Sequence, residues 1–220
     1  MKTKVAVIAG TPVDTAMGVE YLHKKDPQLE LTALPVNRDP REQHLFQLTS
    51  YENKHQRLSE VFSEAEENGI RDFFIYCNSL SGAFDFDSFA KERGVRIYTP
   101  LQIYREIGST VKRAAVIAAN NQSTAGIEKS LFENNPNVNV IGLGMLELVF
   151  AVESKLPPEK IVNDFALDKL CRFFEENGAD CLILGCTHFP YFLKELEKIT
   201  ALPVIDPADL MYKKLTEGLQ

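Results

Sequence analysis

The sequence lacks the features that mark several common classes of protein. It has only four cysteines in 220 residues, and no two of them form a C-x-x-C pair. The apolar run near its start is shorter than the core of a signal peptide, so we expect a reducing cytoplasm and not a disulfide framework. No apolar stretch approaches the roughly 20 residues that a membrane-spanning helix needs. We therefore expect a cytoplasmic protein with no membrane partner.

Excess positive charge is also missing. The chain has 24 Lys and Arg against 31 Asp and Glu, a net charge of −7. Nucleic-acid binding relies on clustered Lys and Arg, so we expect no nucleic-acid partner. The glycine-containing stretches 9–18 and 142–146 do not match the G-x-G-x-x-G dinucleotide fingerprint, and one C-x-H element at Cys186 and His188 lacks the companions of a metal site. We expect neither a cofactor nor a metal.

What the sequence does contain is a regular alternation of short apolar runs and longer amphipathic stretches. Such alternation predicts an α/β fold with parallel sheets covered by helices on both faces. We predict long helices over about 45–68, ended by Gly69, and from Pro157 to Gly178, with a last helix over 208–217. The predicted strands are 5–9, 29–34, 72–76, 95–98, 114–118, 138–143, 181–184 and 202–205.

Two halves of the chain align at a constant offset. The segment KVAVIAGTPVDTAMG begins at Lys4 and RAAVIAANNQSTAG begins at Arg113, so the offset is 113 − 4 = 109. The segments EENGIRDFFIYC and EENGADCLILGC end at Cys77 and Cys186, and 186 − 77 is again 109. An unchanged offset across two separate motifs indicates a duplicated half-molecule.

The duplication predicts two α/β lobes related by a pseudo-twofold axis. We expect an N-terminal lobe over residues 1–100, with the segment 208–220 packing back on it, and a C-terminal lobe over 101–207. Small molecules bind at the carboxyl ends of the strands of such sheets, so we expect an active site in the cleft between the lobes. Symmetric dimers are the commonest oligomers, and we expect a homodimer.

Two cysteines follow predicted strands. At a strand-to-helix turn, backbone N–H groups and the helix dipole favour a thiolate, and this applies to Cys77 and Cys186. One thiolate can remove a proton from a substrate carbon while the opposite thiol supplies one to the other face, which inverts that carbon. Nearby like charges resist double ionisation, so a singly protonated pair is the expected resting state. For Cys171 and Cys181 we favour the alternative, a buried structural thiol.

The motifs GCTHFP at 185–190 and CNSLSG at 77–82, spaced in this way, resemble the aspartate/glutamate racemase superfamily over essentially the whole chain. The resemblance implies cofactor-independent racemisation of an acidic amino acid, with Cys77 and Cys186 as the acid/base pair. It implies that Asn78, Ser79, Thr187 and His188 bind the substrate or assist a cysteine. Thr11 and Asn120 join this set because they follow predicted strands, and Arg41 joins it because the aspartate-racemase branch uses an arginine in the corresponding loop.

The chain departs from the family pattern in two places. Glutamate racemases carry Asp-Ser-Gly-x-Gly-Gly after the first strand, where this chain has AGTPVDTAMG, and we read Asp14 within it as a helix cap. The loop LPVNRDPREQ resembles the aspartate branch, whereas His188 is typical of the glutamate type. The sequence thus leaves aspartate and glutamate open. It also leaves two other functions open: a related maleate isomerase or decarboxylase, and a sensor that binds an acidic ligand without catalysis.

Overall fold

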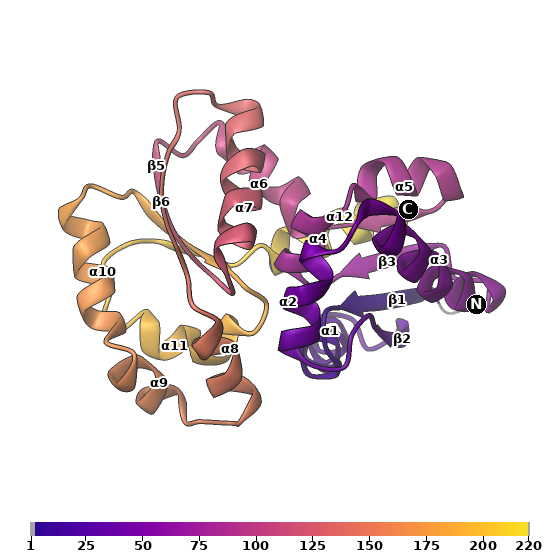
Figure 1. The fold of residues 1–220 in the computed structure, drawn as a ribbon, viewed down its shortest axis with the longest axis horizontal. Coiled ribbons are helices and arrows are strands. Elements are labelled where there is room, and N and C mark those ends of the chain that lie inside the picture. Colours follow the sequence, from indigo (N-terminus) through magenta and orange to yellow (C-terminus); the bar gives the residue numbers. More distant parts are fainter. Residues whose placement is uncertain (1–2, 220) are drawn as a thin grey trace. The chain divides into compact units, whose positions relative to one another are not determined.

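The computed structural model describes residues 3–219, which form two compact units. One unit runs to Ile103 and resumes at Ala208, and the other comprises Tyr104–Pro207. Each unit contains one four-stranded parallel sheet with helices packed around it (Figure 1). The predicted α/β class with two short parallel sheets is confirmed.

The first unit is built on a sheet with the strand order β2-β1-β3-β4. Each neighbouring pair of strands is parallel, and helices connect them along the chain. The elements are β1 (Lys4–Ala9), α1 (Pro12–Lys25), β2 (Glu30–Pro35), α2 (Pro40–Leu48), α3 (Tyr51–Glu67), β3 (Asp72–Ile75), α4 (Asn78–Ala83), α5 (Phe86–Arg93), β4 (Arg96–Tyr98) and α12 (Ala208–Gly218). The last helix, expected over 208–217, is confirmed.

The second unit has the equivalent strand order, β6-β5-β7-β8, again with parallel pairing throughout. Helix α6 (Pro100–Gly108) carries the chain into it. Its elements are β5 (Arg113–Ala118), α7 (Asn121–Asn134), β6 (Asn139–Gly144), α8 (Leu146–Glu153), α9 (Pro158–Asp164), α10 (Leu167–Glu176), β7 (Cys181–Gly185), the 3₁₀ helix η1 (Phe189–Phe192), α11 (Leu193–Leu196) and β8 (Val204–Ile205).

The constant offset seen in the sequence recurs in the elements. β1 and β5 begin at residues 4 and 113, α1 and α7 at 12 and 121, β2 and β6 at 30 and 139, and β3 and β7 at 72 and 181. These starts differ by 109 in every case (113 − 4, 121 − 12, 139 − 30 and 181 − 72). The duplication therefore extends from two motifs to the order and spacing of strands within each unit.

Local capping explains why the first helix of each unit begins where it does. Thr11 caps α1: its backbone N–H donates to the Asp14 carboxylate at 2.7 Å, and its hydroxyl accepts from the Asp14 N–H. This is a capping box, which satisfies donors that have no partner inside the helix. In α7, Asn120 accepts the Ser123 N–H at 2.9 Å. The reading of Asp14 as a cap is confirmed.

Two of the predicted long helices are interrupted. The segment 45–68 contains the end of α2 and all of α3, because the Ser50 hydroxyl accepts the Asn53 N–H and starts a new helix there. The segment from Pro157 to Gly178 divides into α9 and α10 at Ala166, whose φ of 50° is left-handed and cannot continue a right-handed helix. The helical pattern of both segments does not by itself reveal where one helix ends and the next begins.

Glycine ends both segments as predicted. Gly69 and Gly178 have φ values of +76° and +74°, a conformation that side chains disfavour and that commonly follows the last turn of a helix. These two glycines are also 178 − 69 = 109 residues apart. All eight predicted strands are confirmed, with ends that differ from the prediction by at most two residues.

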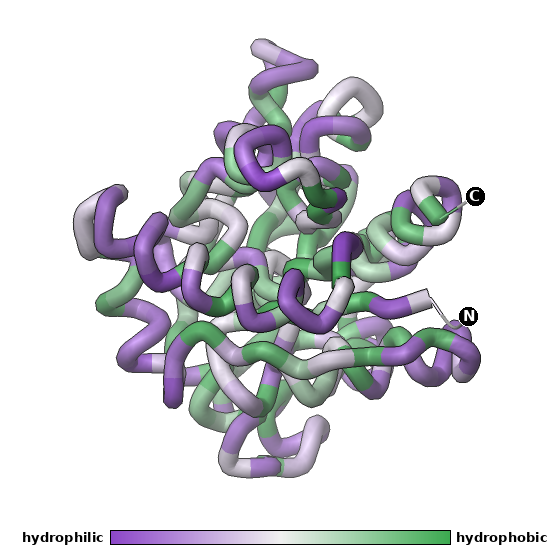
Figure 2. The backbone as a smooth tube through the Cα atoms, turned by 90° about the vertical axis from the view of Figure 1, so that its right-hand side faces the viewer, coloured by the Kyte–Doolittle hydropathy of each residue, from purple (hydrophilic) through white to green (hydrophobic). Residues whose placement is uncertain are grey.

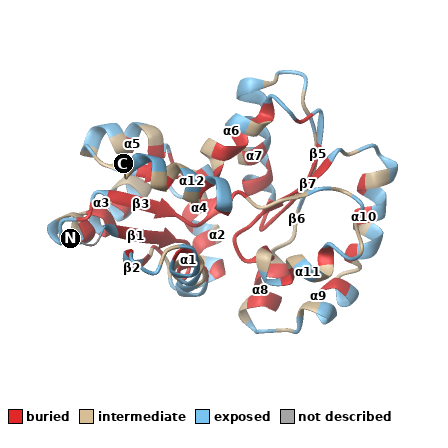
Figure 3. Cartoon of the chain, turned by 180° about the vertical axis from the view of Figure 1, so that it is seen from behind, coloured by how far each residue is buried: buried red, intermediate tan, exposed pale blue. Residues whose placement is uncertain are grey.

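The central strands form the interior of each unit. Residues 5–9 and 114–118 are fully buried, and Figure 3 shows β1, β3, β5 and β7 buried while much of the helical surface is exposed. Hydrophilic and hydrophobic residues alternate along the coiled parts of the chain (Figure 2), as amphipathic packing requires. Within residues 3–219 no helix combines the length and the apolar character needed to cross a bilayer.

Aromatic rings fill much of the core of the first unit. Phe62 of α3 stacks on Phe73 of β3 with ring centroids 4.2 Å apart, and Phe89 of α5 meets it edge-on at 5.0 Å. Phe62 and Phe73 are completely buried. This cluster holds α3 and α5 against the sheet. Cys77 follows β3, the strand that carries Phe73.

We predict that Phe62→Ala lowers the free energy of unfolding by about 3–5 kcal/mol, because it removes a buried ring and leaves a cavity. Phe132, which is 51% exposed, supplies the control: Phe132→Ala is expected to cost less than about 1 kcal/mol. Urea unfolding followed by circular dichroism measures both. Equal losses for the two variants would contradict this account of the core.

Candidate functional site

The register of the first sheet fixes the position of Cys77. Ile75, the last residue of β3, pairs with Ile8, and the Tyr76 N–H donates to the Ile8 carbonyl at 2.8 Å. Cys77 therefore follows the last ladder hydrogen bond, where it forms the N-cap of α4. Its side chain is buried, and its Sγ lies 3.3 Å from the Ser79 Oγ.

Other polar residues gather at the same edge of this sheet. Thr11 follows β1, the neighbour of β3, and Thr11, Asn78 and Ser79 are all buried. The sequence analysis missed one member of this group, Gln43 of α2. Its Nε2 donates to the Ser79 Oγ at 3.1 Å, and its Oε1 accepts from the Asn37 Nδ2 at 2.6 Å. Gln43 belongs to no recognisable motif, and only the fold brings it to Ser79.

The second cysteine lies at the corresponding edge of the other sheet. β7 ends at Gly185, which pairs with Ala118, and Cys186 follows it. A Cβ at Gly185 would lie 2.5 Å from Cδ1 of Ile127 and 3.1 Å from the Ile117 carbonyl oxygen, so a larger residue here would force the surrounding core to shift. Phe189 is fully buried in the core that also encloses Cys186. In the GCTHFP motif, Gly185 and Phe189 thus pack in the core. The residues between them, 186–188, are the candidates for a chemical role.

His188 connects Cys186 to a carboxylate. The His188 Nδ1 lies 3.6 Å from the Cys186 Sγ, and its Nε2 lies 3.0 Å from Oε1 of Glu153. A carboxylate accepts hydrogen bonds, so the Glu153 contact places a hydrogen on Nε2. Nδ1 can then accept the thiol proton of Cys186, or donate to the thiolate once the imidazole is charged. The prediction that His188 assists a cysteine now has a specific geometry.

Glu153 is the second residue that the sequence analysis missed. It is the last residue of α8, whose sequence LELVFAVE is mostly apolar. Its side chain is 18% exposed, whereas that of His188 is 4% exposed. The sequence could have pointed to Glu153, because an acidic residue at the end of an apolar, largely buried helix needs a polar partner for its carboxylate.

Polar side chains follow both cysteines, at Asn78 and Ser79 in one unit and at Thr187 and His188 in the other. The N-cap of α4 is Cys77 itself, and the four-residue η1 follows His188; neither helix has a side-chain capping bond. The backbone turns directly from strand to helix, so these polar side chains are not used as caps.

The remaining predicted site residues occupy different surroundings. Thr187 and Asn120 are buried at the carboxyl ends of the strands of the second sheet, where the Asn120 Oδ1 also caps α7 by accepting the Ser123 N–H. Arg41 lies in the first turn of α2 and is exposed. Arg38, the other arginine of the loop, forms an ion pair with Glu42. A role for Arg41 in binding substrate stays a prediction.

Cys171 and Cys181 have the surroundings of structural thiols. Cys171 is fully buried on α10, and burial raises its pKa to about 11. Cys181 begins β7, and burial, with the neighbouring Asp180, raises its pKa to about 12. Such thiols hold their protons near neutral pH and react slowly. Burial also raises the pKa of Tyr104 well above its usual value, and negative charge at Asp206 and Cys186 adds to this effect.

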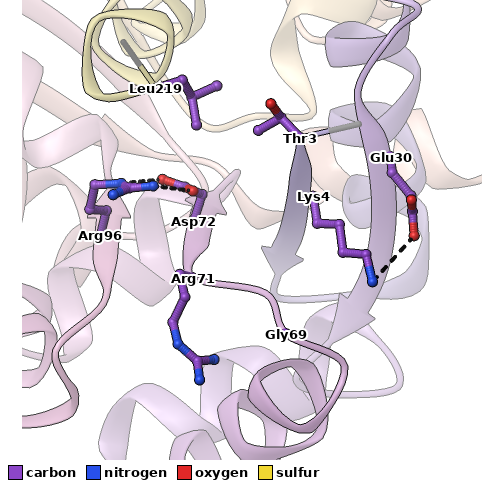
Figure 4. A pocket seen from close by; sticks show the side chains of 8 residues that line it. All are labelled: Thr3, Lys4, Glu30, Gly69, Arg71, Asp72, Arg96 and Leu219. Atoms are coloured by element: carbon purple, nitrogen blue, oxygen red, sulfur yellow. Dashed lines mark hydrogen bonds and ion pairs between the residues drawn. The ribbon is translucent and has the colours of Figure 1, made fainter. Parts of the chain in front are cut away.

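A cavity of about 630 Å³ in the first unit lies away from the cysteine. It opens at the amino ends of the strands, where Arg96 donates two hydrogen bonds of 2.6 Å to Asp72 and Lys4 pairs with Glu30 at 3.9 Å (Figure 4). Cys77 lies at the carboxyl ends, so this cavity is separate from the candidate site. Between residues 3 and 219, no group of three or more His, Cys, Asp or Glu side chains is arranged to hold a metal ion.

Comparison with known proteins identifies relatives of this chain. Residues 50–215 match the family model described as Asp/Glu/Hydantoin racemase. The glutamate racemase of Corynebacterium glutamicum is 30% identical over 135 residues, which cover 59% of this chain and 48% of that protein. Glutamate racemase 1 of Caldanaerobacter subterraneus is 25% identical over 157 residues, 68% of this chain and 56% of that protein. The chain thus spans about half the length of the curated relatives it matches.

Solved structures share the fold over nearly the whole chain. Glutamate racemase from Francisella tularensis, in complex with D-glutamate, superposes with a TM-score of 0.75 at 18% identity, covering 99% of this chain and 82% of that one. An aspartate racemase homologue from Pyrococcus horikoshii gives a TM-score of 0.69 at 18% identity, covering 99% and 98%. At 18% identity, the structural similarity shows only that the fold is shared. Membership of a family rests on the match of residues 50–215 to the family model. The chain belongs to the Asp/Glu/Hydantoin racemase family.

Proposed function

We propose that this protein is a cofactor-independent racemase of an acidic amino acid, in which Cys77 and Cys186 exchange protons with the α-carbon. One observation carries the proposal. Each unit places a buried cysteine within two residues of the end of the equivalent strand, and each thiol contacts a polar side chain two residues further on, Ser79 or His188. Membership of the racemase family supports the same reading.

The proposed reaction is a proton exchange with no net change in the protein's charge. The thiolate of one cysteine removes the α-proton: the C–H bond breaks, an S–H bond forms, and the electron pair stays on the substrate. The thiol of the other cysteine then breaks its S–H bond and gives its proton to the opposite face of the carbon. The enzyme is left with the proton on the other sulfur, ready for the reverse direction. The mechanism requires both sulfurs to reach one carbon.

Proton transfer by the thiols accounts for only part of the necessary rate. A positioned acid or base contributes roughly 10²–10⁴-fold, and a proton next to a carboxylate is far less acidic than a thiol. The developing negative charge therefore needs fixed hydrogen-bond donors, each worth on the order of 10²–10³-fold. We assign this role to buried polar residues at the carboxyl ends of the two sheets, which are Asn78, Asn120 and Thr187.

His188 and Glu153 give Cys186 a place for its proton. When His188 accepts the thiol proton at Nδ1, the Glu153 carboxylate stabilises the imidazolium through Nε2 at 3.0 Å. Cys186 is then a thiolate able to remove the α-proton. With the imidazole neutral and Cys186 protonated, the same thiol is the acid. The histidine thus lets one sulfur serve both directions.

Glutamate is the first substrate to test. The curated relatives that share sequence with this chain are glutamate racemases. Aspartate is the second, because the arginine-containing loop before α2 resembles the aspartate branch and Arg41 is exposed there to meet a side-chain carboxylate. We also propose a homodimer that works in the cytoplasm, as the sequence led us to expect.

We predict that the parent chain exchanges the α-proton of glutamate or aspartate for deuterium in D₂O and racemises it. Cys77→Ala and Cys186→Ala each remove an acid or base, so each should lower racemisation at least 10²-fold. Cys171→Ala and Cys181→Ala are the matched controls and should keep the parent rate. Proton NMR follows exchange, and chiral chromatography follows racemisation.

Three outcomes contradict the proposal in different ways. Parent-like racemisation by Cys77→Ala or Cys186→Ala would refute the two-thiol mechanism. Binding of both amino acids without exchange by the parent chain would favour the sensor. Turnover of maleate or a substituted malonate, without amino-acid exchange, would favour the related isomerase or decarboxylase.

We predict that Glu153→Gln lowers kcat about 10- to 100-fold with little change in KM, because Glu153 acts through His188 and does not touch the substrate. Loss of the carboxylate also destabilises the imidazolium, so the limb of the pH–rate profile that depends on His188 should move to lower pH. Glu147→Gln, on the exposed side of the same helix, is the control and should change neither quantity. An unmoved pH profile for Glu153→Gln would contradict the assigned role.

A further inference from the structure

A chain of hydrogen bonds between uncharged side chains leads to Cys77. Asn37 Nδ2 donates to Gln43 Oε1 at 2.6 Å, Gln43 Nε2 donates to Ser79 Oγ at 3.1 Å, and Ser79 Oγ lies 3.3 Å from Cys77 Sγ. Gln43 and Ser79 are 5% and 7% exposed, so water competes little for these contacts. We call this set, Asn37, Gln43 and Ser79, the amide relay.

The amide relay has a counterpart in the second unit. Ser79 and His188 both lie two residues after their cysteine, and 188 − 79 = 109. Gln43 lies on α2 and Glu153 on α8, and each of these helices follows the edge strand of its sheet, β2 or β6. In both units, therefore, the helix after the edge strand supplies a side chain that hydrogen-bonds the residue two positions after the cysteine. The Gln43 amide binds Ser79 in the first unit, and the Glu153 carboxylate binds His188 in the second.

The direction of the hydrogen bonds in the amide relay is determined from its outer end. Because Gln43 accepts from Asn37 through Oε1, the group that it presents to Ser79 is the Nε2 donor. The Ser79 oxygen accepts this bond, which leaves the hydroxyl hydrogen to be donated elsewhere. The Cys77 sulfur lies within reach at 3.3 Å.

We propose that Gln43 is a positioning residue for Cys77: held by Asn37, it turns the Ser79 hydroxyl so that this group donates its hydrogen bond to the Cys77 sulfur. A donated hydrogen bond favours the thiolate over the thiol. None of the three relay residues takes up a proton near neutral pH. Cys77 is therefore tuned by a neutral chain, whereas Cys186 is coupled to a histidine and a carboxylate that change charge.

Gly10 keeps the space that Gln43 occupies. A Cβ at Gly10 would lie 2.8 Å from Cγ and Cδ of Gln43 and 2.9 Å from its Oε1. Any other residue at this position would displace the Gln43 side chain, and a flexible side chain can move at little cost to the fold. The glycine gives a second way to disturb the amide relay without changing Gln43.

The test is residue-resolved alkylation of the full chain with iodoacetamide, read by peptide mass spectrometry between about pH 6 and about pH 9. We expect Gln43→Met, Gly10→Ala and Ser79→Ala each to lower Cys77 labelling at neutral pH by roughly three- to tenfold, about what one hydrogen bond contributes. The labelling midpoint of Cys77 should move to higher pH. Cys186 labelling should not change.

The chain offers three controls. Gln47→Met alters the next turn of α2, where the Gln47 amide reaches only the Gln43 carbonyl at 3.5 Å, and it should leave Cys77 unchanged. Cys171 and Cys181, with pKa values raised to about 11 and about 12, should stay unlabelled in every folded variant. If Gln43→Met exposes them, that variant has opened, and Gly10→Ala then decides the question.

An unchanged Cys77 profile in Gln43→Met and Gly10→Ala would overturn the proposal. A fall of equal size in Cys77 and Cys186 labelling would also overturn it, because the effect would then be general. The relevance of the amide relay to catalysis rests on the proposed racemase, but labelling does not require turnover. If Cys77 labelling falls in these variants but the parent chain racemises neither amino acid, the positioning role of Gln43 is supported and the proposed reaction is refuted.

Discussion

The backbone register of two central strand pairs is the constraint on which the site depends. β3 pairs with β1 and β7 pairs with β5, and the pairings end at Ile75 and Gly185, two residues and one residue before a cysteine. A shift of one residue would turn the cysteine to the opposite face of its sheet. The fully buried residues 5–9 and 114–118 make such a shift costly, since they must fit helices on both faces. The packing of these apolar strands thus sets the positions of the two sulfurs.

The duplicated halves supply the same scaffold and differ in the groups that support each thiol. Two residues after the cysteine stands a serine in one unit and a histidine in the other, and behind these stand Gln43 and Glu153. The chain behind Cys77 is therefore neutral, whereas the chain behind Cys186 includes groups that carry charge. In the proposed racemisation this difference would give the two directions unlike bases, so we expect the two directions to respond differently to pH.

Much of the fold follows from the sequence because its local signals agree. Each strand is a short apolar run, Gly69 and Gly178 end helices through left-handed backbone, and Asp14 forms a capping box. The breaks at Ser50 and Ala166 were missed, since a helical pattern lies on both sides of each break and only capping or backbone geometry reveals them. Both cysteines were found from the 109-residue offset. Gln43 and Glu153 were not, because residues 36 and 35 positions from their partners become neighbours only through strand order.

The central claim is that both sulfurs act on one carbon, and a crystal structure with bound D- or L-glutamate tests it most directly. The account predicts an α-carbon between Cys77 Sγ and Cys186 Sγ, each within roughly 3–4 Å of it and on opposite faces. The Ser79 and His188 contacts should persist. Sulfurs separated by much more than about 7 Å in the bound state, or both on one face of the carbon, would contradict the account.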